Sequence, residues 1–242
     1  MLQVFSKEFN GFLNSLIAYI VIGVFLTAIG LLMWVFPDTS VLDYGYAEME
    51  TLFVGGPYVF MFLVPAITMR SFAEERKAGT IEMLLTKPLT DWDIVNGKFL
   101  ANFFLVLFAL APTVLYYFSV HNLGSPTGNI DTPGVIGSYI GIAFLAAAFC
   151  AIGIFASSIT SNQIVAFILA AFLCFLAFLG FDSISSLAIW QSDALTIKQL
   201  GILYHYDSMR RGLIDTRDVV YFLSVIFLML SLTKLIVGSR QW

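Results

Sequence analysis

Met69–Leu100 reads MRSFAEERKAGTIEMLLTKPLTDWDIVNGKFL, a charged stretch between two long apolar runs that constrains how the rest of the chain can fold. We call it the charged segment. Its ten ionisable side chains are Arg70, Glu74, Glu75, Arg76, Lys77, Glu82, Lys87, Asp91, Asp93 and Lys98. Ionisable groups are costly in hydrocarbon. So many in one stretch predict that the segment protrudes into water, where a partner outside this chain can contact it.

On both sides of the charged segment the chain is strongly apolar. Of its 242 residues, 59% are hydrophobic and 12% are charged, which is typical of a polytopic membrane protein. A hydrocarbon core of about 30 Å requires a helix of roughly 20 apolar residues. Six runs have about that length: 13–36, 52–69, 99–120, 135–159, 164–181 and 219–237. The predicted fold is an all-α membrane protein with six transmembrane helices in a single domain, 1–242.

The basic residues of the loops predict the orientation. With the N-terminus in the cytoplasm, eight of the twelve lysines and arginines lie inside, and the four outer ones all fall within 182–218. This distribution obeys the positive-inside rule with both termini cytoplasmic. The first run is too long for a cleaved signal and has no small-residue cleavage site after it, so it is expected to be a permanent span.

Shorter segments outside the spans also carry patterns. Apolar residues recur at helical spacing from Leu2 to Leu13, which predicts an N-terminal interfacial helix; a disordered tail is the alternative. The outer loop 182–218 mixes apolar and charged residues in helical spacing and predicts short helices before the sixth span. The joint at 160–163 is short enough only for a tight inner turn.

Local signals divide the charged segment, 70–98, into pieces. A helix is expected to about Ala78, with a break at Gly79. Thr80 can cap a short helix over 81–86, which Pro88 ends. The spacing from Thr90 to Asp93 is that of a capping box and starts the helix that becomes the third span. The short helix is either a rigid knob that moves the second and third spans together or a solvated connector whose charges only fix topology.

The pattern E-R-K-x-G-T-I-E-x-L-L-x-x-P, from Glu75 to Pro88, resembles the signature between the second and third spans of type-2 ABC exporter permeases. The resemblance extends over the whole chain. Four segments resemble more closely the gliding-motility ABC permease of Bacteroidetes-type bacteria: WVFPDTSVLDYGYA, PAITMRSFAEERKAGTIEMLLTKP, IGIFASSITSNQIVAF and RGLIDTRDVVYFLS. It implies a cytoplasmic coupling helix on which an ATPase sits. The residues expected at that contact are Glu74, Glu75, Arg76, Gly79, Thr80, Glu82, Leu84, Leu85 and Pro88.

The same resemblance implies partners and a location. Two copies of an ABC ATPase subunit and a second permease, identical or related, are expected, in the bacterial cytoplasmic (inner) membrane. ATP and Mg are expected on the ATPase, since the chain contains no G-x-x-x-x-G-K-[ST] motif for phosphate. No cofactor is expected on this chain, and no nucleic-acid partner.

Catalytic and metal-binding patterns are missing from the sequence. H-E-x-x-H and G-x-S-x-G are absent, and the two histidines, His121 and His205, have no neighbouring ligand set. Cys150 and Cys174 fall in mid-span and are expected to be packing residues. The chain is therefore expected not to be an enzyme and to hold no metal.

Two other classes of function stay open at this stage. A membrane anchor of a motility or secretion assembly could use the same charged segment for docking alone. An ion-driven carrier is disfavoured because the span centres contain no ionisable side chain. The transported substrate cannot be inferred from a surface of apolar and small polar side chains.

Overall fold

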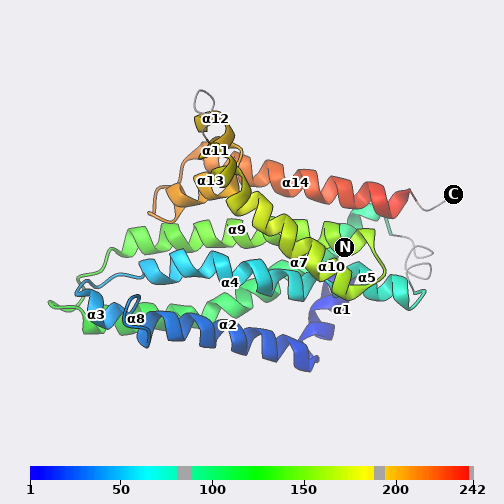
Figure 1. Ribbon diagram of the computed structural model, residues 1–242. Coiled ribbons are helices and arrows are strands. Elements are labelled where there is room, and N and C mark those ends of the chain that lie inside the picture. The colour runs from blue at the N-terminus through cyan, green and yellow to red at the C-terminus, as the bar shows by residue number, and fades with distance from the viewer. Residues whose placement is uncertain (81–88, 188–193, 240–242) are drawn as a thin grey trace.

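The computed structural model describes residues 1–80, 89–187 and 194–239, and within these ranges every regular element is helical (Figure 1). Five helical stretches in this part of the chain are long and apolar enough to cross a membrane, namely 50–77, 91–123, 132–159, 163–185 and 216–238. A bent pair near the N-terminus adds a sixth. The all-α membrane fold predicted from the sequence is confirmed.

The sixth candidate span is the first in the chain. α1 (Leu2–Leu13) is amphipathic and is followed by the apolar α2 (Leu16–Trp34), and the two are bent by 69° at the short break between them. The short α3 (Val41–Tyr44) follows, with the Ser40 hydroxyl accepting a hydrogen bond from the amide of Leu42. The bend allows α2 to cross a bilayer while α1 lies across the end of the bundle.

Prolines shape the next two long helices. α4 (Glu50–Thr68) contains Pro57 and Pro65 and continues into α5 (Arg70–Lys77). α7 (Asp91–Leu110) passes through one turn of 3₁₀ helix, η1 (Ala111–Thr113), into α8 (Val114–Leu123). Pro112 lies in η1, where its missing N–H removes a bond from the α-helical ladder.

α9 (Thr132–Ile159) is the central helix of the bundle and packs against α4, α7, α10 and α14. Glycines allow it to pack closely against the α13 region. A Cβ on Gly141 would stand 2.8 Å from the Cβ of Met209, and one on Gly137 would stand 2.7 Å from the Cα of Gly212. The G-x-x-x-G spacing in this helix therefore serves packing within the chain.

The last third of the chain begins with α10 (Gln163–Phe175), whose start is capped by Asn162 after a tight turn. A π-helical turn, η2 (Leu176–Gly180), leads into α11 (Phe181–Ser185). Two short helices, α12 (Ala194–Gln199) and α13 (Ile202–Met209), precede the long α14 (Thr216–Gly238). These are the short helices that the sequence predicts before the final span.

The chain begins and ends at the same end of the bundle. The Met1 amino nitrogen lies 3.3 Å from Asp93 Oδ1, and a Cβ on Gly238 would lie 3.3 Å from Asp91 Oδ2. Both contacts are with the first turn of α7, beside α5. We call this the α5 end and the opposite one the α13 end. A described chain that starts and finishes at one end traverses the bundle an even number of times, which agrees with six spans.

Candidate functional site

The predicted contact residues divide between described and undescribed parts of the chain. Glu74, Glu75 and Arg76 lie on α5, and Gly79 and Thr80 follow its last turn. The short helix expected over 81–86 lies outside the described residues, as do four of the predicted site residues, Glu82, Leu84, Leu85 and Pro88.

The structure explains why α5 ends where the sequence predicts. Gly79 adopts φ +69°, in the left-handed region that side chains other than that of glycine rarely enter. The backbone amide of Thr80 then donates to the carbonyl of Glu75 at 3.0 Å, and its hydroxyl reaches the same oxygen at 3.4 Å. In the described contacts Thr80 thus closes the end of α5. The break at Gly79 is confirmed.

The start of α5 is capped by another helix. Its first backbone N–H groups have no intrahelical acceptor, and Met69, at the cap position, supplies none. Ser157 of α9 fills this role: its hydroxyl accepts from the amides of Phe72 and Ala73 at 3.0 and 3.1 Å and donates to the carbonyl of Met69 at 2.9 Å. α5 is thereby fixed to the central helix.

A buried lysine joins three further elements. Lys98 of α7 has a side chain only 1% exposed, and its ammonium group donates to Glu8 Oε1 at 2.9 Å and to the carbonyl of Ser71 at 2.6 Å. Glu75 Oε2 lies 3.0 Å from the same nitrogen. The contacts with Glu8 and Ser71 are hydrogen bonds, and the contact with Glu75 is an ion pair. We call Glu8, Glu75 and Lys98 the ion cluster; it joins α1, α5 and α7.

The ion cluster corrects one expectation. The sequence predicts that the charged segment, Lys98 included, protrudes into water, and for Lys98 this is wrong. Its charge is tolerated in the interior because two carboxylates, themselves only 17% and 13% exposed, and a backbone carbonyl replace the water it loses. Neighbouring Asn102, also buried, donates to Ser71 Oγ at 2.8 Å and extends the polar contacts one turn deeper.

Other contacts fix α7 at the same end. Thr90 and Asp93 form the predicted capping box: the Thr90 hydroxyl accepts from the amide of Asp93, and the Asp93 carboxylate accepts from the amide of Thr90. The ammonium group of Lys234, on α14, lies 5.3 Å from the centre of the Trp92 ring. The α5 end thus brings α1, α5, α7, α9 and α14 together.

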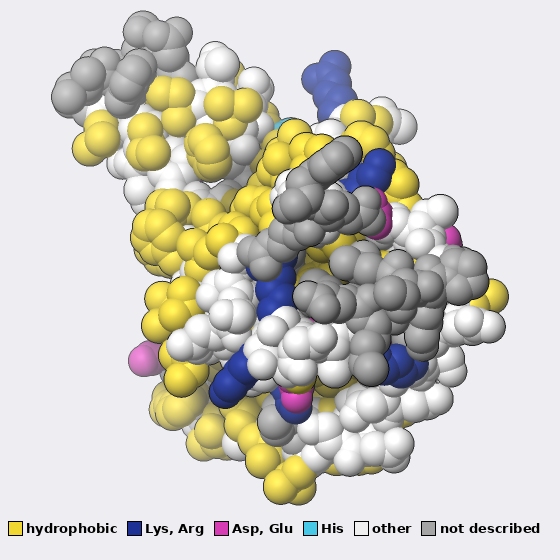
Figure 2. All heavy atoms as spheres, turned by 90° about the vertical axis from the view of Figure 1, so that its right-hand side faces the viewer, with side chains coloured by type: hydrophobic (Ala, Val, Ile, Leu, Met, Phe, Trp, Pro, Cys, Tyr) yellow, Lys and Arg dark blue, Asp and Glu magenta, His cyan; other side chains and the backbone are white. Residues whose placement is uncertain are grey.

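The exposed surface at this end comprises charged and small residues. Glu74, Lys77, Gly79 and Thr80 face solvent, and Glu74 is held by Arg70 at 2.9 Å on the same helix. The guanidinium nitrogens of Arg76 are buried. Figure 2 looks onto this end, where charged side chains emerge among uncharged atoms while hydrophobic side chains occupy much of the periphery.

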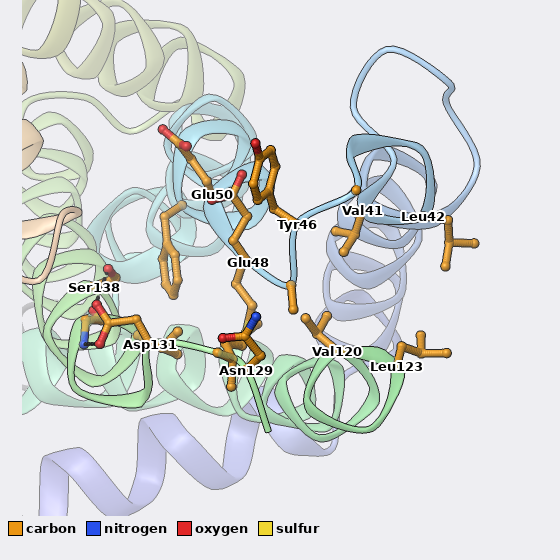
Figure 3. Close-up of a pocket in the computed structure, with 18 of the residues that line it drawn as sticks. Val41, Leu42, Tyr46, Glu48, Glu50, Val120, Leu123, Asn129, Asp131 and Ser138 are labelled. Carbon is orange, nitrogen blue, oxygen red and sulfur yellow. Dashed lines mark hydrogen bonds between the residues drawn. The ribbon is translucent and has the colours of Figure 1, made fainter. Parts of the chain in front are cut away.

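The opposite end carries a cavity of about 670 Å³ (Figure 3). Its wall combines apolar side chains such as Phe53 and Val120 with the carboxylates of Glu48 and Glu50. Arg210 also lines it and is already held by Glu50, at 2.9 Å, and by Asp207, at 2.8 Å.

Sequence reasoning missed the residues that fix the site. Lys98 and Glu8 are 90 positions apart, and Ser157 is more than 80 positions from the amides it caps. A lysine directly before an apolar run was the one available signal. Among the described residues no group of three or more His, Cys, Asp or Glu side chains could hold a metal ion.

Comparison with protein families gives a match over most of the chain. The family model described as ABC-2 family transporter protein matches residues 3–235, which is nearly the whole chain. No curated protein matches the chain at a significant level.

Proposed function

Because this chain belongs to the ABC-2 family of transporter proteins, we propose that it is the membrane permease subunit of an ATP-driven exporter and that its α5 end receives the force produced by a separate ATPase. Membership of the family implies association with an ABC ATPase and with the membrane. The chain itself carries no phosphate-binding motif, so ATP and Mg would be held by that partner.

The observation that carries the proposal is how firmly α5 is connected. Ser157 fixes its start to α9, the ion cluster fixes its last turns to α1 and α7, and it continues directly from α4. Packed, hydrogen-bonded elements move as units rather than deforming. A displacement of the residues that follow α5 would therefore reach four helices, of which α4, α7 and α9 run the length of the bundle.

The predicted contact residues take different parts in this proposal. Glu74, Gly79 and Thr80 are exposed and are proposed to touch the ATPase. Glu75 faces inward and is proposed to transmit the displacement through Lys98. Arg76, in the same helical turn as Glu75, is proposed to take part in this transmission. Glu82, Leu84, Leu85 and Pro88 complete the proposed coupling helix on sequence resemblance.

The orientation and assembly form part of the same proposal. Six of the described basic residues, Lys7, Arg70, Arg76, Lys77, Lys98 and Lys234, belong to elements at the α5 end, which supports a cytoplasmic position for it and for both termini in a bacterial inner membrane. α1, lying across that end, is proposed to rest at the membrane interface. Two ATPase subunits and a second permease, identical or related, would complete the exporter. A role in gliding motility rests on the four sequence segments quoted above.

Cross-linking tests the proposal. Cys150 and Cys174 are buried, so a cysteine placed at exposed Thr80 provides an accessible thiol at the α5 end. In membranes of the native host, Thr80→Cys is expected to cross-link to an ATPase subunit. Tyr46→Cys, also exposed but at the other end, is the matched control and should not. Labelling of Thr80→Cys by a membrane-impermeant thiol reagent added from outside the cell would overturn the proposal.

The second candidate function is that of a membrane anchor, on which a partner docks without any effect on turnover. In the reconstituted complex, Gly79→Pro is expected to lower ATPase turnover and transport, because it changes the backbone at the left-handed residue that ends α5. Complex formation with unaltered turnover in this variant would favour the anchor over the exporter.

A further inference from the structure

His205 lies between two hydrogen-bond acceptors at the α13 end. Its Nδ1 is 2.7 Å from Oδ1 of Asp218, in the first turn of α14, and its Nε2 is 2.9 Å from the backbone carbonyl of Gln199, at the end of α12. The two side chains are 12% and 8% exposed. The ring also stacks on Tyr221 with 3.9 Å between centroids. One imidazole therefore joins three helices.

The two acceptors determine how many hydrogens the His205 ring needs in order to bond both of them. A backbone carbonyl can only accept, so Nε2 must carry a hydrogen, and an ionised carboxylate can only accept, so Nδ1 must carry one too. A neutral imidazole has a single N–H. With the Asp218 carboxylate ionised, both hydrogen bonds can therefore form together only when the ring carries a hydrogen on each nitrogen.

Loss of either ring hydrogen breaks one of the two bonds. With hydrogen on Nε2 alone, the Nδ1 lone pair would face a carboxylate oxygen at 2.7 Å, which is repulsive. With hydrogen on Nδ1 alone, Nε2 would face the carbonyl of Gln199 in the same way. A neutral His205 can hold α14 or the end of α12, but not both.

Several charged side chains surround the pair, and most of them have partners of their own. α9 and η2, which pack against α13, bring no charged side chain; α9 brings the titratable Tyr139. The titratable or charged groups of the other elements are Glu50 of α4, Lys198 of α12, Tyr204, Tyr206 and Asp207 of α13, Arg210 and Arg211 after it, and Asp215, Arg217, Asp218 and Tyr221 of α14. Lys198 is paired with Asp182, Asp207 and Glu50 are paired with Arg210, and Asp215 caps its own helix. Among the described residues, Asp218 is the ion-pair partner of His205.

We propose that His205 and Asp218 form a proton-operated latch that tightens the short helices α12 and α13 onto α14 when His205 is protonated and loosens the end of α12 when it is not. The Tyr221 hydroxyl of α14 donates to the carbonyl of Leu200 at 2.7 Å in either state, so the latch changes how tightly this end is held and does not free it. Histidine ordinarily changes charge between pH 5 and 8. This inference does not depend on the transport proposal, although in the proposed orientation the latch faces the outside. It gives the exporter's outer loop a response to external acidity.

Hydrogen exchange of the permease in lipid nanodiscs tests the latch. The peptide spanning residues 194–204 is compared at about pH 5.5 and about pH 8, after correction for the intrinsic pH dependence of exchange. Protection is expected to fall by about tenfold at the higher pH, since a charge-assisted hydrogen bond is lost. Equal protection at the two pH values would overturn the proposal.

Two variants should change the hydrogen-exchange protection of the loop in opposite directions. In Asp218→Asn the amide can donate to a neutral Nδ1 while Nε2–H still donates to Gln199, so the loop should be protected at both pH values. His205→Phe keeps a ring against Tyr221 but forms neither bond, so the loop should exchange quickly at both. An Asp218→Asn protein that keeps the wild-type pH response, or a His205→Phe protein as protected as wild type at the lower pH, contradicts the latch.

If these variants do not fold, the protonation of the His205 ring can be measured directly. In His121→Gln the remaining histidine is His205, and nitrogen NMR of labelled histidine reports each ring nitrogen. Both nitrogens should be protonated at about pH 5.5 and only one at about pH 8. A neutral ring at the lower pH overturns the proposal.

Discussion

Replacing Lys98 by methionine tests whether the ion cluster stabilises the α5 end. Removing one partner of a buried ion pair ordinarily costs about 3–5 kcal/mol, because the other charge stays buried without compensation. Here two carboxylates, Glu8 and Glu75, lose a cation at 2.9 and 3.0 Å. Lys7 lies 3.4 Å from Glu75 but is 64% exposed and compensates only partly. We expect a loss of about 3 kcal/mol, roughly a 150-fold change in the unfolding equilibrium.

Equilibrium unfolding in mixed detergent micelles, followed by circular dichroism, measures this loss. Lys77→Met is the matched control: Lys77 is exposed at the end of α5, and its replacement should change the free energy of unfolding by less than about 0.5 kcal/mol. A triple variant, Lys98→Met with Glu8→Gln and Glu75→Gln, should recover most of the lost stability, since it buries no unpaired charge.

Two results would refute this reasoning. If Lys98→Met is as stable as Lys77→Met, the ammonium group contributes nothing from its buried position. If the triple variant is as unstable as Lys98→Met alone, the loss comes from packing of the lysine stem and not from uncompensated carboxylates.

Three further predictions address other contacts. Ser157→Ala should lower the free energy of unfolding by about 1–3 kcal/mol, since buried amides at the start of α5 lose their acceptor, and hydrogen exchange of those amides should quicken. Gly141→Val should destabilise the protein by at least about 2 kcal/mol in thermal unfolding because the new side chain meets α13, whereas Gly23→Val, with open space around it, should not. The Asp215 carboxylate accepts a backbone hydrogen bond at the start of α14, which lowers its pKa below the ordinary 3.8. Its stabilising effect is therefore full above pH 3.8 and is lost as the pH falls through the lower folded-state value; hydrogen exchange of that helical turn should show this loss, and Asp215→Asn, which caps without titrating, should not.

Much of the fold could be predicted because its causes are local in the sequence. Apolar runs of span length become helices wherever they occur, since no other structure satisfies backbone groups in hydrocarbon. The capping box at Thr90 and the break at Gly79 depend on residues a few positions apart. Each of these features depends on residues within one turn of the helix that it begins or ends.

The missed features all depend on partners distant in sequence. Nothing near Lys98 indicates that Glu8, 90 residues earlier, will neutralise it, so its charge alone predicted exposure to water. The sequence shows no neighbouring ligand set for His205 because one of its partners is a backbone carbonyl, which has no sequence signature, and the other, Asp218, is 13 positions away. Helical periodicity predicts which face of a helix is apolar, but not which helix will pack against it.

The ion cluster also imposes an order on biogenesis. The ribosome makes Glu8 first, Glu75 next and Lys98 last, so neither carboxylate can meet its buried cation until α7 has been synthesised. Until then, burying either carboxylate costs more free energy than leaving it in water. The N-terminal helix, although translated first, can settle against the bundle only after the third long hydrophobic helix has left the ribosome.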